Sequence, residues 1–401
     1  MLFRSDKVFD LTDIDRLILV GGGKASFGMA GAVEEAIGSL IDTGLIVTKY
    51  GRKQGNLEKT EVLEASHPVP DRAGLEATEN LLDLAGSAEE GDLVIVLISG
   101  GGSALLTLPL DGVGLEEVKR LTEDLLESGA SIGEINTVRK RLSRIKGGRL
   151  ARAIHPARGL VLVISDVVGD DLRYIASGPA FPENSTREDA LNVLEKYDLK
   201  DSHSHVIDVL AGNGRNSEPV TEDEFSGFDI TNQIVASNKT ALAAMARKAE
   251  KMGINPLVLS SMLEGESRYV GGVIGQLARS ISSEQLPLSD PAVLLSGGET
   301  TVTLSGGFGT GGPNQEFTLA AGREILELSN TVVGAIDSDG EDGSTEIAGG
   351  LISGEVEADR EKFTACLDDH DSSDFLKELG SEIVTGQTGT NVNDLRLALV
   401  L

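Results

Sequence analysis

Two glycine-rich segments of this chain have the composition of anion-binding turns. Each follows an apolar run and leads into residues that favour a helix: "LILVGGGKASFGMA" at 17–30 and "LISGGGSALL" at 97–106. Glycine amides and the N-terminus of a helix both favour a bound anion. The residues expected to face it are Gly22, Gly23 and Lys24 in the first segment, and Ser99, Gly100, Gly101, Gly102 and Ser103 in the second.

The two standard nucleotide-binding patterns do not fit the first segment. The dinucleotide fingerprint has a third glycine where this chain has Ser26, and an acidic residue after the second strand, where this chain has Lys49. The loop of P-loop enzymes fails too, because no Gly-Lys-Ser/Thr closes the turn. The pattern therefore predicts an anion without identifying it, and a simple packing turn remains the alternative.

A cluster of positive charge occupies "NTVRKRLSRIKGGRLAR" at 136–152, which has seven basic residues and no acid. In a chain whose formal net charge is −29, this local excess favours a bound anion. We expect Arg139, Lys146 and Arg149 to provide anion contacts. The alternative is a solvated basic face that pairs with nearby carboxylates. RNA binding is disfavoured because no aromatic residue interleaves the charges.

Carboxylates follow two of the apolar runs. "SDVVGDDLRYIASGP" at 165–179 contains Asp166 and Asp170, and "DSDGEDGST" at 337–345 contains Asp339. Such oxygen ligands suit Mg²⁺, although an acidic loop on an acidic protein is the plain alternative. Further polar residues in glycine-rich surroundings are candidate ligand contacts, with helix-cap and turn roles as the competing explanation: Glu299, Asn314, Gln315 and Glu316.

The elements that must position these residues are apolar runs that alternate with helical patterns. Eight runs have the composition of buried parallel strands: 16–21, 43–49, 92–99, 159–165, 233–237, 256–261, 292–298 and 331–337. Their alternation with helical segments such as 241–253 predicts an α/β fold with mainly parallel sheets. "ETTVTLSGG" at 299–307 alternates in polarity and predicts an antiparallel strand. Such folds bind ligands at the carboxyl ends of strands, where the glycine segments fall.

Length and charge limit the class of protein. A chain of 401 residues is expected to form two domains, and the polar segment 210–229 predicts a boundary between 1–225 and 226–401. The charge of −29 argues against nucleic acid and anionic membranes as partners, and fits either a high-salt cytoplasm or an ordinary acidic protein.

A single cysteine, a charged N-terminus and the absence of a membrane-spanning run predict a cytoplasmic protein. Five histidines without ligand spacing predict no zinc site, and His67 is expected to be structural.

Glycine turns, a basic cluster and aspartates together suit phosphoryl transfer, in which a protein neutralises phosphate oxygens and aligns an acceptor. The same motifs resemble the glycerate 2-kinase family, whose C-terminal half contains the MOFRL domain. The matching stretches run in order along most of the chain and include "VGGGKASFGMA", "SHPVPD", "LISGGGSALL", "SNKTALAAM", "GGPNQEFTLAAG" and "DSDGEDGSTEIAGG".

The resemblance implies ATP- and Mg²⁺-dependent phosphorylation of D-glycerate to 2-phosphoglycerate. It implies a Rossmann-like first domain, a smaller mixed α/β second domain and an active site between them, with small molecules as partners and a homodimer left open. The family's catalytic lysine falls on Lys24, and we expect Asp166 and Arg149 to be the other catalytic residues. Asp166, Asp170 and Asp339 are candidates for binding Mg²⁺ or for accepting the hydroxyl proton, and Asp170 and Asp339 are the predicted metal ligands. Substrate or phosphate contacts fall on the two glycine segments and on Arg139, Lys146, Asn238, Glu299, Asn314, Gln315 and Glu316.

One departure from the family pattern and two other functions qualify this interpretation. The pattern has an arginine where this chain has Pro313, so its role either passes to Arg323, Arg396 or the basic cluster, or is absent. An NAD(P)-dependent hydroxypyruvate reductase is an alternative, against which the broken dinucleotide fingerprint argues. A catalytically silent nucleotide- or metabolite-binding protein is the other.

Overall fold

The structure is a computed structural model that describes residues 9–53, 55–212, 218–304 and 309–401. Two compact units make up the chain. The first comprises the chain up to Ser165 together with Asp171–Val235, and the second comprises Asp166–Asp170 together with Ala236–Leu401. Each unit has its own six-stranded sheet, which confirms the prediction of a two-domain α/β protein.

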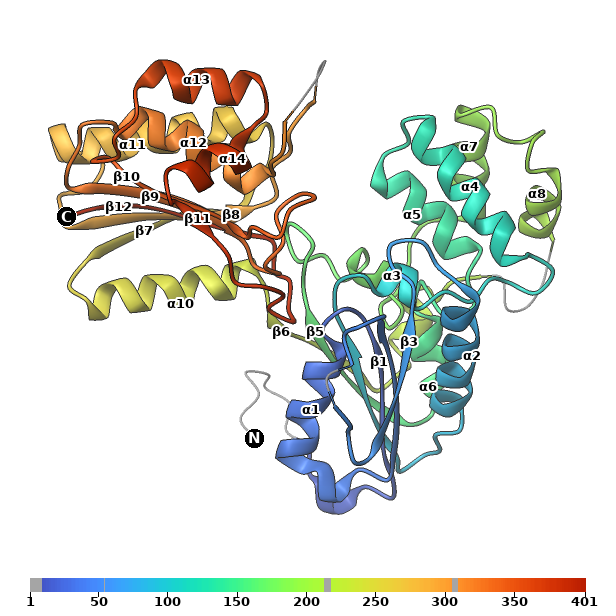
Figure 1. The fold of residues 1–401 in the computed structure, drawn as a ribbon. Coiled ribbons are helices and arrows are strands. Elements are labelled where there is room, and N and C mark those ends of the chain that lie inside the picture. The colour runs from blue at the N-terminus through green and yellow to red at the C-terminus, as the bar shows by residue number, and fades with distance from the viewer. Residues whose placement is uncertain (1–8, 54, 213–217, 305–308) are drawn as a thin grey trace. The chain divides into compact units, whose positions relative to one another are not determined.

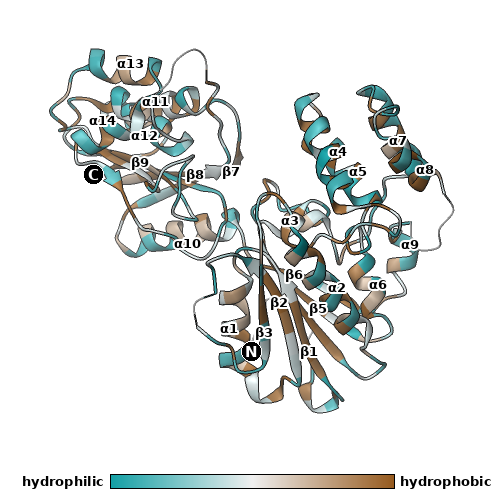
Figure 2. Ribbon diagram, turned by 45° about the vertical axis from the view of Figure 1, so that its right-hand side comes forward, coloured by the Kyte–Doolittle hydropathy of each residue, from teal (hydrophilic) through white to brown (hydrophobic). Residues whose placement is uncertain are grey.

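The first sheet has the strand order β3-β2-β1-β4-β5-β6. Its strands are β1 Leu17–Gly22, β2 Thr43–Lys49, β3 Thr60–Ala65, β4 Leu93–Ile98, β5 Arg158–Ile164 and β6 Ile230–Ala236. All pairings from β3 through β5 are parallel. Strands β1 and β4 are buried along their whole length, as expected of parallel strands covered on both faces, and the sheet of this unit is mostly hydrophobic in Figure 2.

Helices cover both faces of this sheet, with α1 on one side and α2 and α6 on the other (Figure 1). A group of four helices lies at the end of the sheet where the short helix α3 follows β4, and it packs around its own apolar core. The helices of this unit are α1 Ser26–Ile37, α2 Arg72–Gly86, α3 Gly102–Leu105, α4 Leu115–Glu127, α5 Ile132–Arg141, α6 Arg149–Ile154, α7 Arg187–Lys196, α8 Ser204–Ala211 and α9 Glu222–Phe225. Three 3₁₀ turns accompany them: η1 Leu11–Asp13, η2 Gly38–Leu40 and η3 Ile175–Ser177.

The second sheet is mixed, with the order β11-β10-β9-β12-β8-β7. Only the β7–β8 pairing is parallel among those of its described strands. The strands are β7 Asn255–Leu263, β8 Ala292–Gly298, β9 Thr331–Asp337, β10 Gly349–Ser353, β11 Glu382–Ile383 and β12 Asp394–Val400. Helix α10 covers one face, and the other four helices cover the opposite face (Figure 1). The helices are α10 Asn238–Lys251, α11 Ser267–Glu284, α12 Pro313–Ile325, α13 Arg360–Asp368 and α14 Ser372–Glu378.

The structure differs from the predicted elements in three respects. Strands β3, β10, β11 and β12 were not predicted. All eight apolar runs form strands. The segment 299–304, directly after β8, does not, because it runs beside the turn that follows β7, where the Thr301 amide donates to the Gly265 carbonyl at 2.9 Å. Residues 305–307 of that prediction lie outside the described residues. The change from one unit to the next falls after β6 rather than at 225, because β6 is the neighbour of β5 in the first sheet. None of the described helices has the length and apolarity needed to cross a membrane.

Candidate functional site

The two glycine segments meet at the carboxyl edge of the first sheet. One follows β1 and the other follows β4, and these two strands are neighbours in the sheet. Strands β2 and β3 lie on one side of β1, whereas β4 lies on its other side, so the order of strands reverses here. Open α/β sheets bind ligands at such a reversal of strand order. The segments are joined directly: the Lys24 amide donates to the Gly100 carbonyl at 2.8 Å, and the Ala25 amide donates to Ser99 Oγ at 3.0 Å.

The backbone amides of the first glycine segment are hydrogen-bonded within the protein. The Gly23 amide donates to the Val47 carbonyl at 3.1 Å, and the Ser26 amide donates to the Gly23 carbonyl at 3.2 Å. With the Lys24 and Ala25 amides also bonded, this turn offers a ligand the Lys24 side chain rather than a cradle of amides. The predicted anion contacts at Gly22 and Gly23 therefore gain no support from the geometry.

The second glycine segment has open amides. Within the described part of the chain, the amides of Gly100, Gly101 and Ser103 have no hydrogen-bond acceptor, whereas the Gly102 amide bonds the Ser99 carbonyl at 3.2 Å. Gly101 has φ +80°, a conformation that favours glycine. Three neighbouring amides without acceptors can bind an anion.

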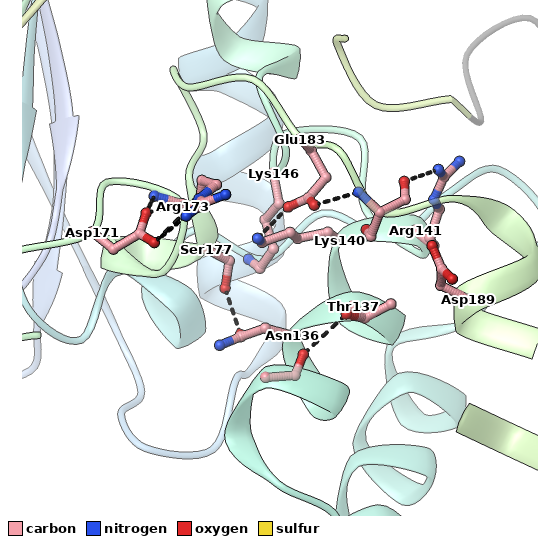
Figure 3. Close-up of polar contacts among 12 residues, drawn as sticks. Asn136, Thr137, Lys140, Arg141, Lys146, Asp171, Arg173, Ser177, Glu183 and Asp189 are labelled. Carbon is pink, nitrogen blue, oxygen red and sulfur yellow. Dashed lines mark hydrogen bonds and ion pairs between the residues drawn. The ribbon is translucent and has the colours of Figure 1, made fainter. Parts of the chain in front are cut away.

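The segment that contains η3 packs against this turn and fixes it. A Cβ atom on Gly102 would lie 2.6 Å from Ala176 Cβ, so only glycine fits there. Ser103 Oγ lies 2.8 Å from Ser177 Oγ, which in turn donates to Asn136 Oδ1 at 3.1 Å (Figure 3 shows the second contact). The open amides therefore belong to a turn held by helix α5 and η3.

His67 lies beside the same turn. A Cβ atom on Gly101 would be 3.1 Å from His67 Nε2 and 3.1 Å from Lys24 Cγ, so the two side chains flank this glycine. Burial of the ring, with Lys24 and Lys49 nearby, lowers the pKa of His67 to about 4. His67 was expected to be structural. Its place after β3, at the same edge of the sheet, makes it a further candidate for the site.

Most of the basic segment pairs with carboxylates, as the alternative interpretation held. Four of its residues do so: Lys140 with Glu183, Arg141 with Glu218, Arg144 with Glu79 and Asp111, and Arg152 with Glu224. Figure 3 shows the first of these pairs beside Lys146. Arg149 is buried, and its Nη1 donates to the carbonyls of Lys140 at 2.8 Å and Lys146 at 2.9 Å. These contacts close the turn after α5, so the structure gives Arg149 a fold-stabilising position rather than an open one.

Arg139 and Lys146 differ from the rest of the segment. No carboxylate of the described chain lies within ion-pair distance of either side chain. The Lys146 ammonium is buried and donates to the Leu106 carbonyl, and burial with Arg139 nearby lowers the pKa of Lys146 to about 7. Burial also lowers the pKa of Arg139. Two neighbouring cations without a counter-ion favour an anionic ligand.

In the second unit, the polar residues at the start of α12 are engaged in structural bonds. The Asp342 carboxylate accepts from the Asn314 amide at 3.1 Å and the Gln315 amide at 2.9 Å, and it caps the helix. Both side chains also donate to it at 3.1 Å. Burial raises the pKa of Asp342 to about 6. Glu316 pairs with Arg268 at 2.7 Å and His370 at 3.0 Å.

Asn238 and Glu299 lie near the ends of β12 and β8. Asn238 Nδ2 donates to the Val392 carbonyl at 2.9 Å and the Asp394 carbonyl at 2.8 Å, which ties α10 to β12. Burial raises the pKa of Glu299, and the charges of Asp394 and Asp166 add to the effect. Glu299 and Asp166 thus lie in a common acidic environment of the second unit, while Asn238 has a fold-stabilising role.

No group of three histidine, cysteine, aspartate or glutamate side chains is placed to hold a metal ion in the described residues. Magnesium at phosphoryl-transfer sites needs only one or two carboxylates, because phosphate oxygens and water complete its shell. The carboxylates around Asp339 suit a magnesium ion. Burial and the negative charges of Asp339 and Asp394 raise the pKa of Asp337, and a bound cation would relieve the repulsion among these carboxylates. Asp170 lies in a turn with φ +59°, and nothing around it strengthens the prediction.

Comparison with known proteins identifies relatives along almost the whole chain. A domain of unknown function, DUF4147, matches residues 2–211, and the MOFRL family matches residues 292–394. A D-glycerate 2-kinase from Thermotoga maritima is 41% identical, and the match covers 97% of this chain and 92% of the relative. A protein from Agrobacterium vitis, provisionally named a hydroxypyruvate reductase, is 41% identical over 96% of this chain and 87% of its own length. The crystal structure of a glycerate kinase from Thermotoga maritima superposes with a TM-score of 0.88 at 40% identity, covering 97% of this chain and 92% of that one.

Proposed function

This chain belongs to the glycerate 2-kinase family, and on that premise we propose that it transfers the γ-phosphoryl group of ATP to the 2-hydroxyl group of D-glycerate. The observation that carries the proposal is the turn at 99–103, where three amides without acceptors lie beside Lys24 and His67. Phosphoryl transfer needs donors for the oxygens of the transferred group and an acceptor for the hydroxyl proton. This turn and its two flanking side chains have that chemistry.

We assign roles to the residues on this basis. The amides of Gly100, Gly101 and Ser103 bind phosphate oxygens, and the Lys24 ammonium balances the charge that develops on them during transfer. The 2-hydroxyl oxygen bonds to the γ-phosphorus as the bond from that phosphorus to the bridging oxygen of ADP breaks. His67, neutral at physiological pH because its pKa is lowered to about 4, accepts the hydroxyl proton and passes it to water.

In the second unit, Asp166 and Asp339 are proposed ligands of Mg²⁺, which when bound would neutralise phosphate charge. Asp166 is also the second candidate for accepting the proton. The sequence-based assignment of Asp170 as a metal ligand remains a prediction. The contacts of Arg149, Asn238, Asn314, Gln315 and Glu316 support positioning roles for these residues rather than substrate contact.

One structural feature favours the reductase as a second candidate. The strand order of the first sheet is that of dinucleotide-binding Rossmann folds. However, the amides of the turn after β1 are bonded within the protein, and Lys49 ends β2 where NAD-dependent enzymes carry an acid. The turn that such enzymes use for the pyrophosphate is therefore closed here.

The experiment that tests the function is product analysis with purified protein, ATP, Mg²⁺ and D-glycerate. Phosphorus NMR is expected to show ADP and 2-phosphoglycerate in equal amounts. Oxidation of NADH by hydroxypyruvate, without phosphorylation of glycerate, would establish the reductase instead. Binding of ATP without either reaction would establish the catalytically silent binding protein.

A further inference from the structure

A cavity of about 230 Å³ lies beside α3, wholly within the first unit. One wall comes from the loop after β3, with Pro68 and Val69, and another from Leu108 and Pro109 beyond α3. Val118 of helix α4 and Leu142, directly after helix α5, complete the lining. Most of the surface is therefore aliphatic, which suits a ligand with a flat apolar part.

Charged and polar groups also line the cavity. Arg139 and Lys146 line it together with Ser103 and Ser143, and helix α4 contributes Lys119, Thr122 and Glu123. Neither Arg139 nor Lys146 has a carboxylate of the described chain within ion-pair distance. Burial of like charges side by side is unfavourable unless an anion joins them. The cavity thus combines an apolar wall with an anion-binding end.

The cavity adjoins the proposed phosphate site. Ser103 lines the cavity with its side chain and carries one of the amides without an acceptor. A ligand that fills the cavity and extends past Ser103 would reach Gly101, against which Lys24 and His67 pack. Its shape would be an apolar head joined to a chain of anionic groups.

We propose that this cavity binds the nucleoside end of ATP, with the base against the aliphatic wall and Arg139 and Lys146 on the phosphates nearest the ribose. The γ-phosphate then lies toward the amides at 100–103. The inference rests on the proposed kinase function. Glycerate is the weaker candidate for the cavity, because a small polar acid has almost no apolar surface to bury there.

Nucleotide binding can be measured directly, without turnover, by titrating the full chain with ADP. The chain has no tryptophan, so Leu126→Trp at the exposed rim of the cavity introduces a single fluorophore. Ile132→Trp is the matched control, because Ile132 is equally exposed but does not line the cavity. ADP is expected to change the emission of the first variant and not of the second.

Two further variants test the recognition groups. Arg139→Gln is expected to weaken ADP binding by about 10- to 100-fold, the effect of losing a charged hydrogen bond. Arg144→Gln, in the same segment but paired with Glu79 and Asp111, is expected to leave it unchanged. Val69→Trp, which fills the cavity from an exposed position, is expected to weaken ADP binding while the binding of inorganic pyrophosphate persists.

Three results would overturn the inference: no binding of ADP by the wild-type chain, ADP affinity unchanged in both Arg139→Gln and Val69→Trp, or a rise in the KM for glycerate alone. Melting curves of each variant verify that it is folded. If the wild-type chain binds ADP as described but does not phosphorylate glycerate, the proposed function fails and the nucleotide site stands.

Discussion

His67 gives the chain a specific sensitivity to acid that can be calculated. Burial of its ring, with Lys24 and Lys49 nearby, lowers its pKa from 6.5 to about 4. Between these values the unfolded chain binds a proton that the folded chain does not, so the stability contributed by neutral His67 is complete above pH 6.5 and is lost as the pH falls toward 4. At 1.36 kcal/mol per pKa unit the full effect is about 3 kcal/mol, of which about 2 kcal/mol is lost between pH 7 and pH 5.

The assay is urea unfolding of the wild type and His67→Gln at both pH values. We expect the free energy of unfolding to fall by about 2 kcal/mol more in the wild type than in the variant over this interval. The other titrating groups are common to both proteins and cancel in the comparison. His205→Gln, which removes an exposed imidazole, is the control and should behave like the wild type. Equal losses in the wild type and His67→Gln, or an NMR titration of His67 near 6.5, would refute the reasoning.

The same substitution reports on the proposed proton acceptor. At pH 7 we expect His67→Gln to lower kcat by about 100-fold or more, the usual contribution of a general base.

Three other substitutions have definite expected outcomes. Lys24→Ala is expected to lower kcat/KM for glycerate phosphorylation by about 10²- to 10³-fold with an unchanged melting temperature; full activity would remove Lys24 from the mechanism. Gly102→Ala brings a methyl group within 2.6 Å of Ala176 Cβ, and calorimetry should show that the free energy of unfolding falls by about 1–3 kcal/mol. In Gly28→Ala the new methyl group has nothing within 4 Å, so the free energy of unfolding should rise by about 0.5–1 kcal/mol. Asp342→Ala leaves two buried amides of α12 without acceptors, and denaturant titration should show a loss of about 3 kcal/mol; a loss under 1 kcal/mol would show that water replaces the carboxylate.

Strands that are completely buried are the easiest to predict from sequence, although the partly exposed strands β6 and β7 were predicted as well. Strands β1 and β4 are buried throughout, so their apolar runs are visible without knowledge of any partner. Strand β12, Asp394–Val400, was not predicted, although it lies in the middle of the second sheet. Its burial alternates along the strand, and its place is set by pairing with β8 and β9, which are distant in sequence.

The sequence could predict the two glycine turns of the candidate site but not which basic residues form ion pairs. Both glycine segments follow buried strands, so their common edge could be inferred from the order of elements. Which basic residues stay without a carboxylate could not be inferred, because the partners lie far along the chain. Lys140 and its partner Glu183 are 43 residues apart, and Arg152 and its partner Glu224 are 72 apart. Only the folded chain shows which basic residues pair with carboxylates and which do not.

The difference between paired and unpaired basic residues bears on how so acidic a protein binds anionic substrates. With a formal charge of −29, ATP and glycerate approach against repulsion, which salt screens beyond about 8 Å at physiological ionic strength. Attraction must then come from contacts at short range. A cation already paired with a carboxylate, such as Lys140, adds little, because the pair is neutral overall. Arg139 keeps its charge toward the cavity, and Lys146, with a pKa of about 7, takes up a proton more readily when an anion arrives. We therefore expect separation from carboxylates, and not the number of basic residues, to decide which members of this segment bind phosphate.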